Sequence, residues 1–219
     1  MNLEKLIKIT NSEKYYQECD LQLIKIEHKK DGVNSANFNF IHESGDFNGI
    51  TNVQKWQLTA HRCEGFQNMR LEKFMPYIQL KLFTDHPLLW RYNNDNLDCE
   101  LIGYPKDIDT FLGQIYQTYI KVSNNWIQAT EEFYATEYAY KKNGRKSLII
   151  PENFKDSIED ICKAHDITFN IKTTIEQDNS KLRYLKVLVF GNNYISPDGF
   201  NIGQPYIIAH DFFVNKIYG

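Results

Sequence analysis

The chain has 219 residues, of which 42% are hydrophobic and 24% charged, and this composition excludes an intrinsically disordered protein. The formal net charge is −3, and neither the first 142 residues nor the rest carry a basic excess, which argues against nucleic-acid or membrane-surface partners. No stretch approaches the roughly 18 apolar residues of a membrane helix, and no secretory signal is visible. We therefore expect a soluble cytoplasmic protein whose four cysteines are reduced.

The first part of the chain predicts a short helix followed by a run of strands. Residues 3–9 have an amphipathic helical pattern. Apolar and polar side chains alternate in the strands that we predict at residues 19–29, 33–42, 50–63, 77–83 and 97–103. The pair Asp31-Gly32 is a typical hairpin turn between the first two strands. We expect these strands to form an antiparallel meander with one face in water.

The apolar period then changes from two residues to that of a helix. Between residues 106 and 122 the apolar side chains recur at positions i, i+3, i+4, i+7 and i+8 from Ile108 onward. Asp107 lies where an N-cap belongs, two residues after Pro105. The pattern predicts a helix over residues 106–122, and we expect its apolar stripe to cover the dry face of the meander.

The last third of the chain mixes both periods. Residues 126–142 fit a helix or a hairpin arm, and the pattern does not decide between them. Residues 151–165 predict a helix, with Pro151 at its first position. Strands are predicted at 167–175 and at 183–190, the second apolar on both faces and hence central in its sheet.

These elements define an α+β fold. We expect an antiparallel β-meander packed by an amphipathic helix over residues 1–142, followed by a smaller helix-plus-strands unit over residues 143–219. Residues 205–214 complete the second unit as a strand or a short helix. The alternatives left open are a single domain and one continuous sheet with its helices on one side.

The most unusual stretch for function is residues 85–92. It follows a predicted strand, and Pro87 is expected to end that strand in a loop. The stretch contains His86, Trp90, Arg91 and Tyr92, whose residue types anchor many protein interfaces. We expect these four side chains to belong to a binding site, against the alternative that the loop folds back onto the core.

Two further groups could carry chemistry. In the strand at 50–63, alternation places His61 and Cys63 together on the face opposite the apolar residues, which makes His61 another candidate binding residue. Cys162 and His165 are three residues apart on a predicted helix, so they are weak candidates for a metal or for a thiolate nucleophile. The more economical interpretation is a buried thiol and a helix-end imidazole, and we expect no metal and no cofactor.

The sequence contains no catalytic or cofactor motif, and we therefore expect a non-catalytic module that binds another protein. An inhibitor or immunity-type protein that neutralises a toxin is one concrete version. Two alternatives stay open. One is a small hydrolase or transferase that uses His86 or the Cys162–His165 pair. The other is a small-molecule carrier with an apolar cavity between sheet and helix.

Overall fold

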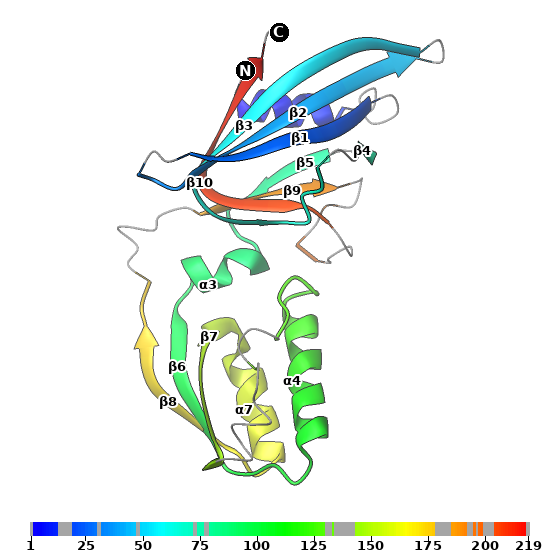
Figure 1. The fold of residues 1–219 in the computed structure, drawn as a ribbon. Helices are drawn as coiled ribbons and strands as arrows, with labels where there is room; N and C mark the ends of the chain where they lie inside the picture. The colour runs from blue at the N-terminus through cyan, green and yellow to red at the C-terminus, as the bar shows by residue number, and fades with distance from the viewer. Residues whose placement is uncertain are drawn as a thin grey trace. The chain divides into compact units, whose positions relative to one another are not determined.

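The computed structural model describes residues 2–12, 19–29, 32–46, 49–71, 74–76, 79–129, 133, 143–177, 185–191, 195, 197–198 and 204–217. The expected α+β class is confirmed, with antiparallel sheets and a small number of helices (Figure 1). The chain forms two compact units. The first unit comprises Met1–Asp85, Tyr184–Ser196 and Asn201–Gly219, and the second comprises His86–Arg183 and Pro197–Phe200. None of the helices within the described residues is long and apolar enough to cross a membrane.

The first unit contains a seven-stranded antiparallel sheet, sheet A, and one helix. The strands of sheet A are β1 (Cys19–Lys29), β2 (Ser35–Asp46), β3 (Gly49–Gln67), β4 (Phe74–Pro76), β5 (Gln79–Phe83), β9 (Lys186–Gly191) and β10 (Tyr206–Ile217). Their order across the sheet is β4-β1-β2-β3-β10-β9-β5. The predicted meander is therefore present in β1, β2 and β3, while the end of the chain returns to pair with β3.

A bulge in β1 explains why its apolar residues depart from strict alternation. Leu23 lies opposite Phe40 of β2 and Lys25 lies opposite Asn39, so that Ile24 is an extra residue in β1. One extra residue shifts all later side chains to the other face. As a result Leu23 before the bulge and Ile26 after it both face the core, although their positions differ by three, an odd number.

Sheet A curls around its own core. The rings of Phe40 in β2 and Phe190 in β9 are stacked with centroids 5.8 Å apart, although two strands separate β2 from β9. In a flat sheet that separation would be about 14 Å, since neighbouring strands lie about 4.8 Å apart. The inner face thus encloses the core, to which helix α1 (Leu3–Thr10), the expected first helix, adds Leu3 and Leu6.

The second unit contains a three-stranded sheet, sheet B, in the order β7-β6-β8. Its elements are η1 (Pro87–Leu89), α3 (Trp90–Asn93), β6 (Asn96–Ile102), α4 (Ile108–Val122), β7 (Arg145–Pro151), η2 (Glu152–Phe154), α7 (Lys155–Ala164) and β8 (Thr168–Ile175). Helices α4 and α7 lie side by side over sheet B (Figure 1). Pro151 closes β7 instead of opening the helix, because the 3₁₀ turn η2 intervenes before α7.

Helix α4 is the predicted helix of residues 106–122, and Asp107 caps it by accepting hydrogen bonds from two backbone N–H groups. Its buried stripe is Phe111, Ile115 and Tyr119. The stripe packs on sheet B, not on the N-terminal meander as expected, because β6 leaves the meander and pairs with β7 and β8. The interior under α4 is filled by rings: Tyr119 stacks on Phe154 with centroids 4.0 Å apart.

The compact units do not follow the expected division at residue 142. That boundary would separate β6 from β7, which pair along their whole length, and would separate β3 from β10. The prediction that residues 183–190 form a central strand agrees with β9, whose residues 187–190 are all buried between β10 and β5. The open question of helix or hairpin at residues 126–142 falls mostly outside the described residues.

Candidate binding site

Residues 86–93 form a helical segment instead of the expected loop. His86 is the N-cap of η1, and its Nδ1 accepts a hydrogen bond from the backbone N–H of Leu88 at 3.3 Å. Pro87 occupies the first position of η1, where its missing N–H costs nothing and its fixed φ favours a helical turn. The combination of a capping side chain and a proline therefore starts η1, and α3 continues it.

The side chain of His86 is part of the interior, with 1% of its surface exposed. Its ring meets Trp126 edge to face, with centroids 4.4 Å apart. Burial lowers the pKa of His86 to about 4, so the imidazole is neutral at pH 7. A solvent-borne partner does not reach this ring, and the contacts assign it the structural role of a cap.

The other three residues of the segment differ in exposure. Trp90 is half-buried and meets Phe154 edge to face at 5.8 Å, which ties it to the core of the second unit. Tyr92 is half-buried, and Arg91 is exposed. The backbone carbonyl of Arg91 accepts a hydrogen bond from the Asn96 amide at 3.0 Å, which fixes the end of the helical turn. A binding role for Trp90, Arg91 and Tyr92 stays a prediction.

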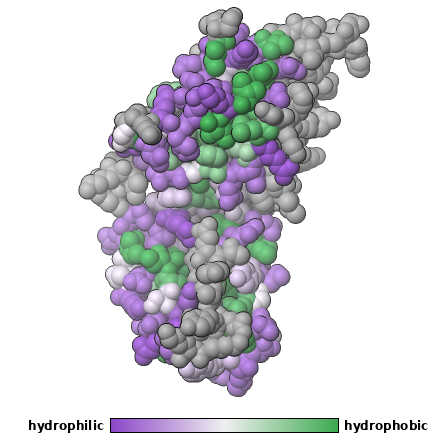
Figure 2. Space-filling model, in the orientation of Figure 1, coloured by the Kyte–Doolittle hydropathy of each residue, from purple (hydrophilic) through white to green (hydrophobic). Residues whose placement is uncertain are grey.

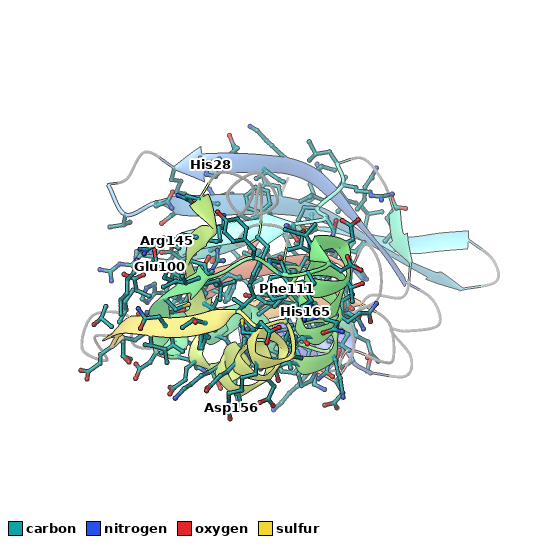
Figure 3. All side chains as sticks on the ribbon, turned by 90° about the horizontal axis from the view of Figure 1, so that it is seen from below. His28, Glu100, Phe111, Arg145, Asp156 and His165 are labelled. Carbon is teal, nitrogen blue, oxygen red and sulfur yellow. The ribbon has the colours of Figure 1, made fainter. Side chains whose placement is uncertain are left out.

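Cys162 and His165 lie in different surroundings. Cys162 is fully buried under α7, and burial, followed by the nearby Cys99, raises the pKa of its thiol to about 12. His165 follows the last residue of α7, where its Nε2 lies 3.1 Å from Gln114 Oε1 and its ring meets Phe111 edge to face. Figure 3 shows His165 beside Phe111. A thiol with so high a pKa is a poor nucleophile and metal ligand. Within the described residues no group of three or more potential ligands surrounds a metal position.

The expected shared face of His61 and Cys63 is wrong. Cys63 is buried in the core with Leu58 and Ala60, whereas His61 is on the opposite face. The reason is Arg62, which adopts a left-handed backbone with φ of 49° and interrupts the alternation of β3. Ser35 Oγ lies 3.3 Å from His61 Nδ1, so the imidazole is held against β2.

His61 belongs to a broad polar surface, which we call the outer face of sheet A. It consists of the side chains of β1, β2, β3 and β10 that point away from the core: Gln22, Lys25, Glu27, Lys29, Ser35, Asn37, Asn39, Ile41, Glu43, Val53, Lys55, Gln57, Thr59, His61, Asp211, Phe213, Asn215 and Ile217. Directly paired residues of neighbouring strands share a face, so these side chains form rows across the four strands.

Hydrogen bonds between β2 and β3 fix two of these rows in addition to the Ser35–His61 contact. Gln57 Nε2 donates to Asn39 Oδ1 at 3.0 Å, and Thr59 Oγ1 donates to Asn37 Oδ1 at 2.8 Å. The remaining amide N–H groups of Asn37 and Asn39, and the carbonyl of Gln57, have no partner among the described residues. The half-buried Asn39, Gln57 and Thr59 thus present ordered polar groups on the outer face, whereas Asn37 is buried and holds Thr59 in place.

Phe213 of β10 lies within this polar frame. It is directly opposite Thr59, 55% of its surface is exposed, and its ring meets His61 edge to face at 6.3 Å. The charges around it are paired: Lys186 binds Asp211 at 2.9 Å, and Lys25 binds Glu27 at 2.7 Å. The outer face therefore combines one projecting aromatic ring, fixed amides and two ion pairs.

The structure assigns the sequence candidates to two separate units, with His61 in the first and His86, Trp90, Arg91 and Tyr92 in the second. Sequence reasoning did not single out Asn37, Gln57 and Phe213 as candidate site residues. The alternation of β2 and β3 indicates a polar face, but only the register shows which side chains meet on it. In the comparisons with known proteins, no family model, no curated protein and no solved structure matches the chain.

Proposed function

We propose that this chain is a non-catalytic protein-binding module and that the outer face of sheet A is its recognition surface. The observation that carries the proposal is Phe213, an exposed aromatic residue inside a frame of mutually bonded polar side chains. Figure 2 shows several patches of hydrophobic residues on a mostly hydrophilic surface, so exposure alone would not distinguish Phe213. What distinguishes it is the ordered polar frame around it.

The polar frame lowers the entropy lost on binding. Fixing a flexible polar side chain at an interface costs about 0.5–1.5 kcal/mol. In Asn37, Asn39 and Gln57 part of that cost is already met within the free protein, since each side chain is held by a neighbour. Ordered donors and acceptors around an aromatic anchor are the usual organisation of an energetic centre in a protein interface.

Phe213 supplies the apolar anchor. A phenylalanine buries about 150–250 Å², so covering the exposed 55% of Phe213 removes on the order of 100 Å² of apolar surface from water. At about 25 cal/mol per Å² this burial is worth about 2–3 kcal/mol. One residue of this size is enough to dominate the affinity of a small interface.

An enzymatic role has less support on the same face. Ser35, His61 and Asp211 lie in one row, with Ser35 Oγ 3.3 Å from the imidazole and Asp211 directly opposite His61. A nucleophile must touch its substrate, and Ser35 is only 1% exposed. The carrier alternative has less support too, since Phe111, Tyr119 and Phe154 occupy the space between α4 and sheet B.

The test compares Phe213→Ala with Ile149→Ala. Ile149 of β7 is a matched control, because it is also an exposed apolar strand residue, at 52%, in the other unit. A partner captured from the native host is titrated against each variant. We expect Phe213→Ala to weaken binding by about 2 kcal/mol, or roughly 30-fold, at an unchanged melting temperature. Equal affinities of wild type and Phe213→Ala would rule out the outer face as the recognition surface.

A further inference from the structure

We propose that a second copy of this chain is a partner of the outer face of sheet A, so that two copies associate weakly through these faces about a two-fold axis. This inference rests on the proposed function, because it names one protein that the recognition surface binds. The first argument is charge. Among the described side chains of the outer face, the basic residues Lys25, Lys29 and Lys55 are balanced by three acidic ones: Glu27, Glu43 and Asp211.

This balance makes the face electrostatically compatible with itself. A surface adapted to a charged partner carries an excess of the opposite sign, which would repel a second copy. Here two of the charges are already paired within the face, Lys25 with Glu27 at 2.7 Å, and Asp211 is paired with Lys186 of β9 at 2.9 Å. Two such faces can therefore approach with little net repulsion, because the charges of their described side chains sum to zero.

The polar groups are also self-complementary. In a two-fold interface the same patch meets itself, so each donor row must find acceptors on an identical row. An amide side chain carries two donors and an acceptor in one group. Asn37, Asn39, Gln57 and Asn215 form such an amide-rich area on three neighbouring strands. Amides opposite amides satisfy one another in either direction, which a face made only of lysines or carboxylates would not allow.

The apolar residues would be buried in the same contact. Phe213 and Ile217 project from the same face of β10, and Val53 projects from β3. From Ser35 to Glu43 the face is about 27 Å long, and its four strands span about 19 Å, so its area is at most about 500 Å². The curl of sheet A makes this face convex, so two copies would meet over less than that area. A standard interface covers about 800 Å² of each partner. We therefore expect a weak dimer, with a dissociation constant on the order of 10–100 μM.

Pairing through the sheet edges is the competing route to self-association, and two of the described edge strands are protected against it. The edge strand β8 has a bulge at Lys172, whose Nζ donates to Ser147 Oγ at 3.2 Å. The edge strand β5 is short and carries Lys81 at its centre. Lysines, bulges and short length are the devices that keep edges from pairing. These two edge strands are therefore poor sites for a second copy.

The experiment is sedimentation velocity of the full chain between roughly 5 and 500 μM, a range that brackets the expected dissociation constant. We expect the average mass of the wild type to rise from 25.9 kDa toward twice that value. Phe213→Glu replaces an apolar residue of the contact by a charged one in each copy and should weaken dimerisation at least 30-fold, whereas the control Ile149→Glu should dimerise like the wild type. Gln57→Lys tests the same contact if Phe213→Glu fails to fold.

A wild type that stays at the monomer mass over the whole range would overturn the dimer. Dimerisation of a folded Phe213→Glu or Gln57→Lys at wild-type strength would overturn the assignment of the face. Either result leaves the proposed function to its own test, because Phe213→Ala can still lose a different captured partner. The two tests can also give opposite results. If Phe213→Glu abolishes the dimer but Phe213→Ala still binds the captured partner with wild-type affinity, self-association through the outer face is supported. The outer face is then refuted as the binding site for that captured partner.

Discussion

Replacing Tyr119 by phenylalanine should stabilise the protein, against the usual effect of a core substitution. Tyr119 is fully buried between the rings of Phe154 and Phe133, and burial raises the pKa of its hydroxyl. Among the described residues that hydroxyl has no hydrogen-bond partner. A buried polar group left unpaired costs about 1–3 kcal/mol. Removing one oxygen leaves a gap of about 10–15 Å³, which costs about 0.3 kcal/mol at 24 cal/mol per Å³. The net expectation is a gain of about 1–2 kcal/mol.

Urea unfolding followed by circular dichroism measures this gain as a higher midpoint at an unchanged slope. Tyr116→Phe is the matched control, because Tyr116 is on the same helix but only half-buried. Tyr116→Phe should change the free energy of unfolding by no more than about 0.5 kcal/mol. If Tyr119→Phe instead lowers the free energy of unfolding by 1 kcal/mol or more, the hydroxyl is bonded in solution and the packing described for the core of the second unit is wrong.

Three further predictions concern stability. Phe111→Ala removes a fully buried ring under α4 and should cost about 3–5 kcal/mol in urea unfolding, and a loss under 1 kcal/mol would contradict the buried face of α4. The pKa of His86 is about 4 when folded and about 6.5 when unfolded, so the unfolded state takes up its proton first as pH falls. His86 should therefore lower the free energy of unfolding by up to about 3 kcal/mol from pH 7 to pH 4, and His86→Asn, which can still cap η1, should remove this share of the slope in pH-dependent melts. The share of His42, whose pKa burial also lowers to about 4, should remain. Arg62 has a φ of 49°, a backbone conformation that a β-branched residue avoids and glycine adopts readily. Arg62→Val should therefore lower the free energy of unfolding by about 1–2 kcal/mol, while Arg62→Gly should leave it unchanged. Equal thermal midpoints for the two variants would refute the left-handed bulge.

Local patterns predict the elements of this fold well. Helix α4 follows from the apolar spacing that begins at Ile108 and from the cap at Asp107, both of which act within one or two turns. The strand β9 follows from a run that is apolar on both faces. These signals depend on residues near each other in the sequence, where backbone geometry alone decides which side chains share a face.

The pairing of strands into sheets depends on contacts between residues far apart in the sequence, and local patterns predict it less well. The strand β6 lies near the meander in sequence but pairs with β7 and β8, and β10 returns across more than 130 residues to pair with β3. The site depends on the same non-local register. Ser35 and His61 are 26 residues apart, and a single left-handed residue, Arg62, moves Cys63 to the core face. Alternation indicates that a polar face exists, but pairing and bulges decide which residues compose it.

Photo-crosslinking tests the central claim most directly. The photoreactive amino acid p-benzoylphenylalanine is placed at position 213 of the outer face and, as the control, at position 149 of β7, and each protein is irradiated in its native host. We predict that position 213 gives a discrete crosslinked band, containing either a second copy of the chain or another protein, and that position 149 gives none. Crosslinks from position 149 alone, or none from position 213 in folded protein, would contradict the assignment of the outer face as the recognition surface.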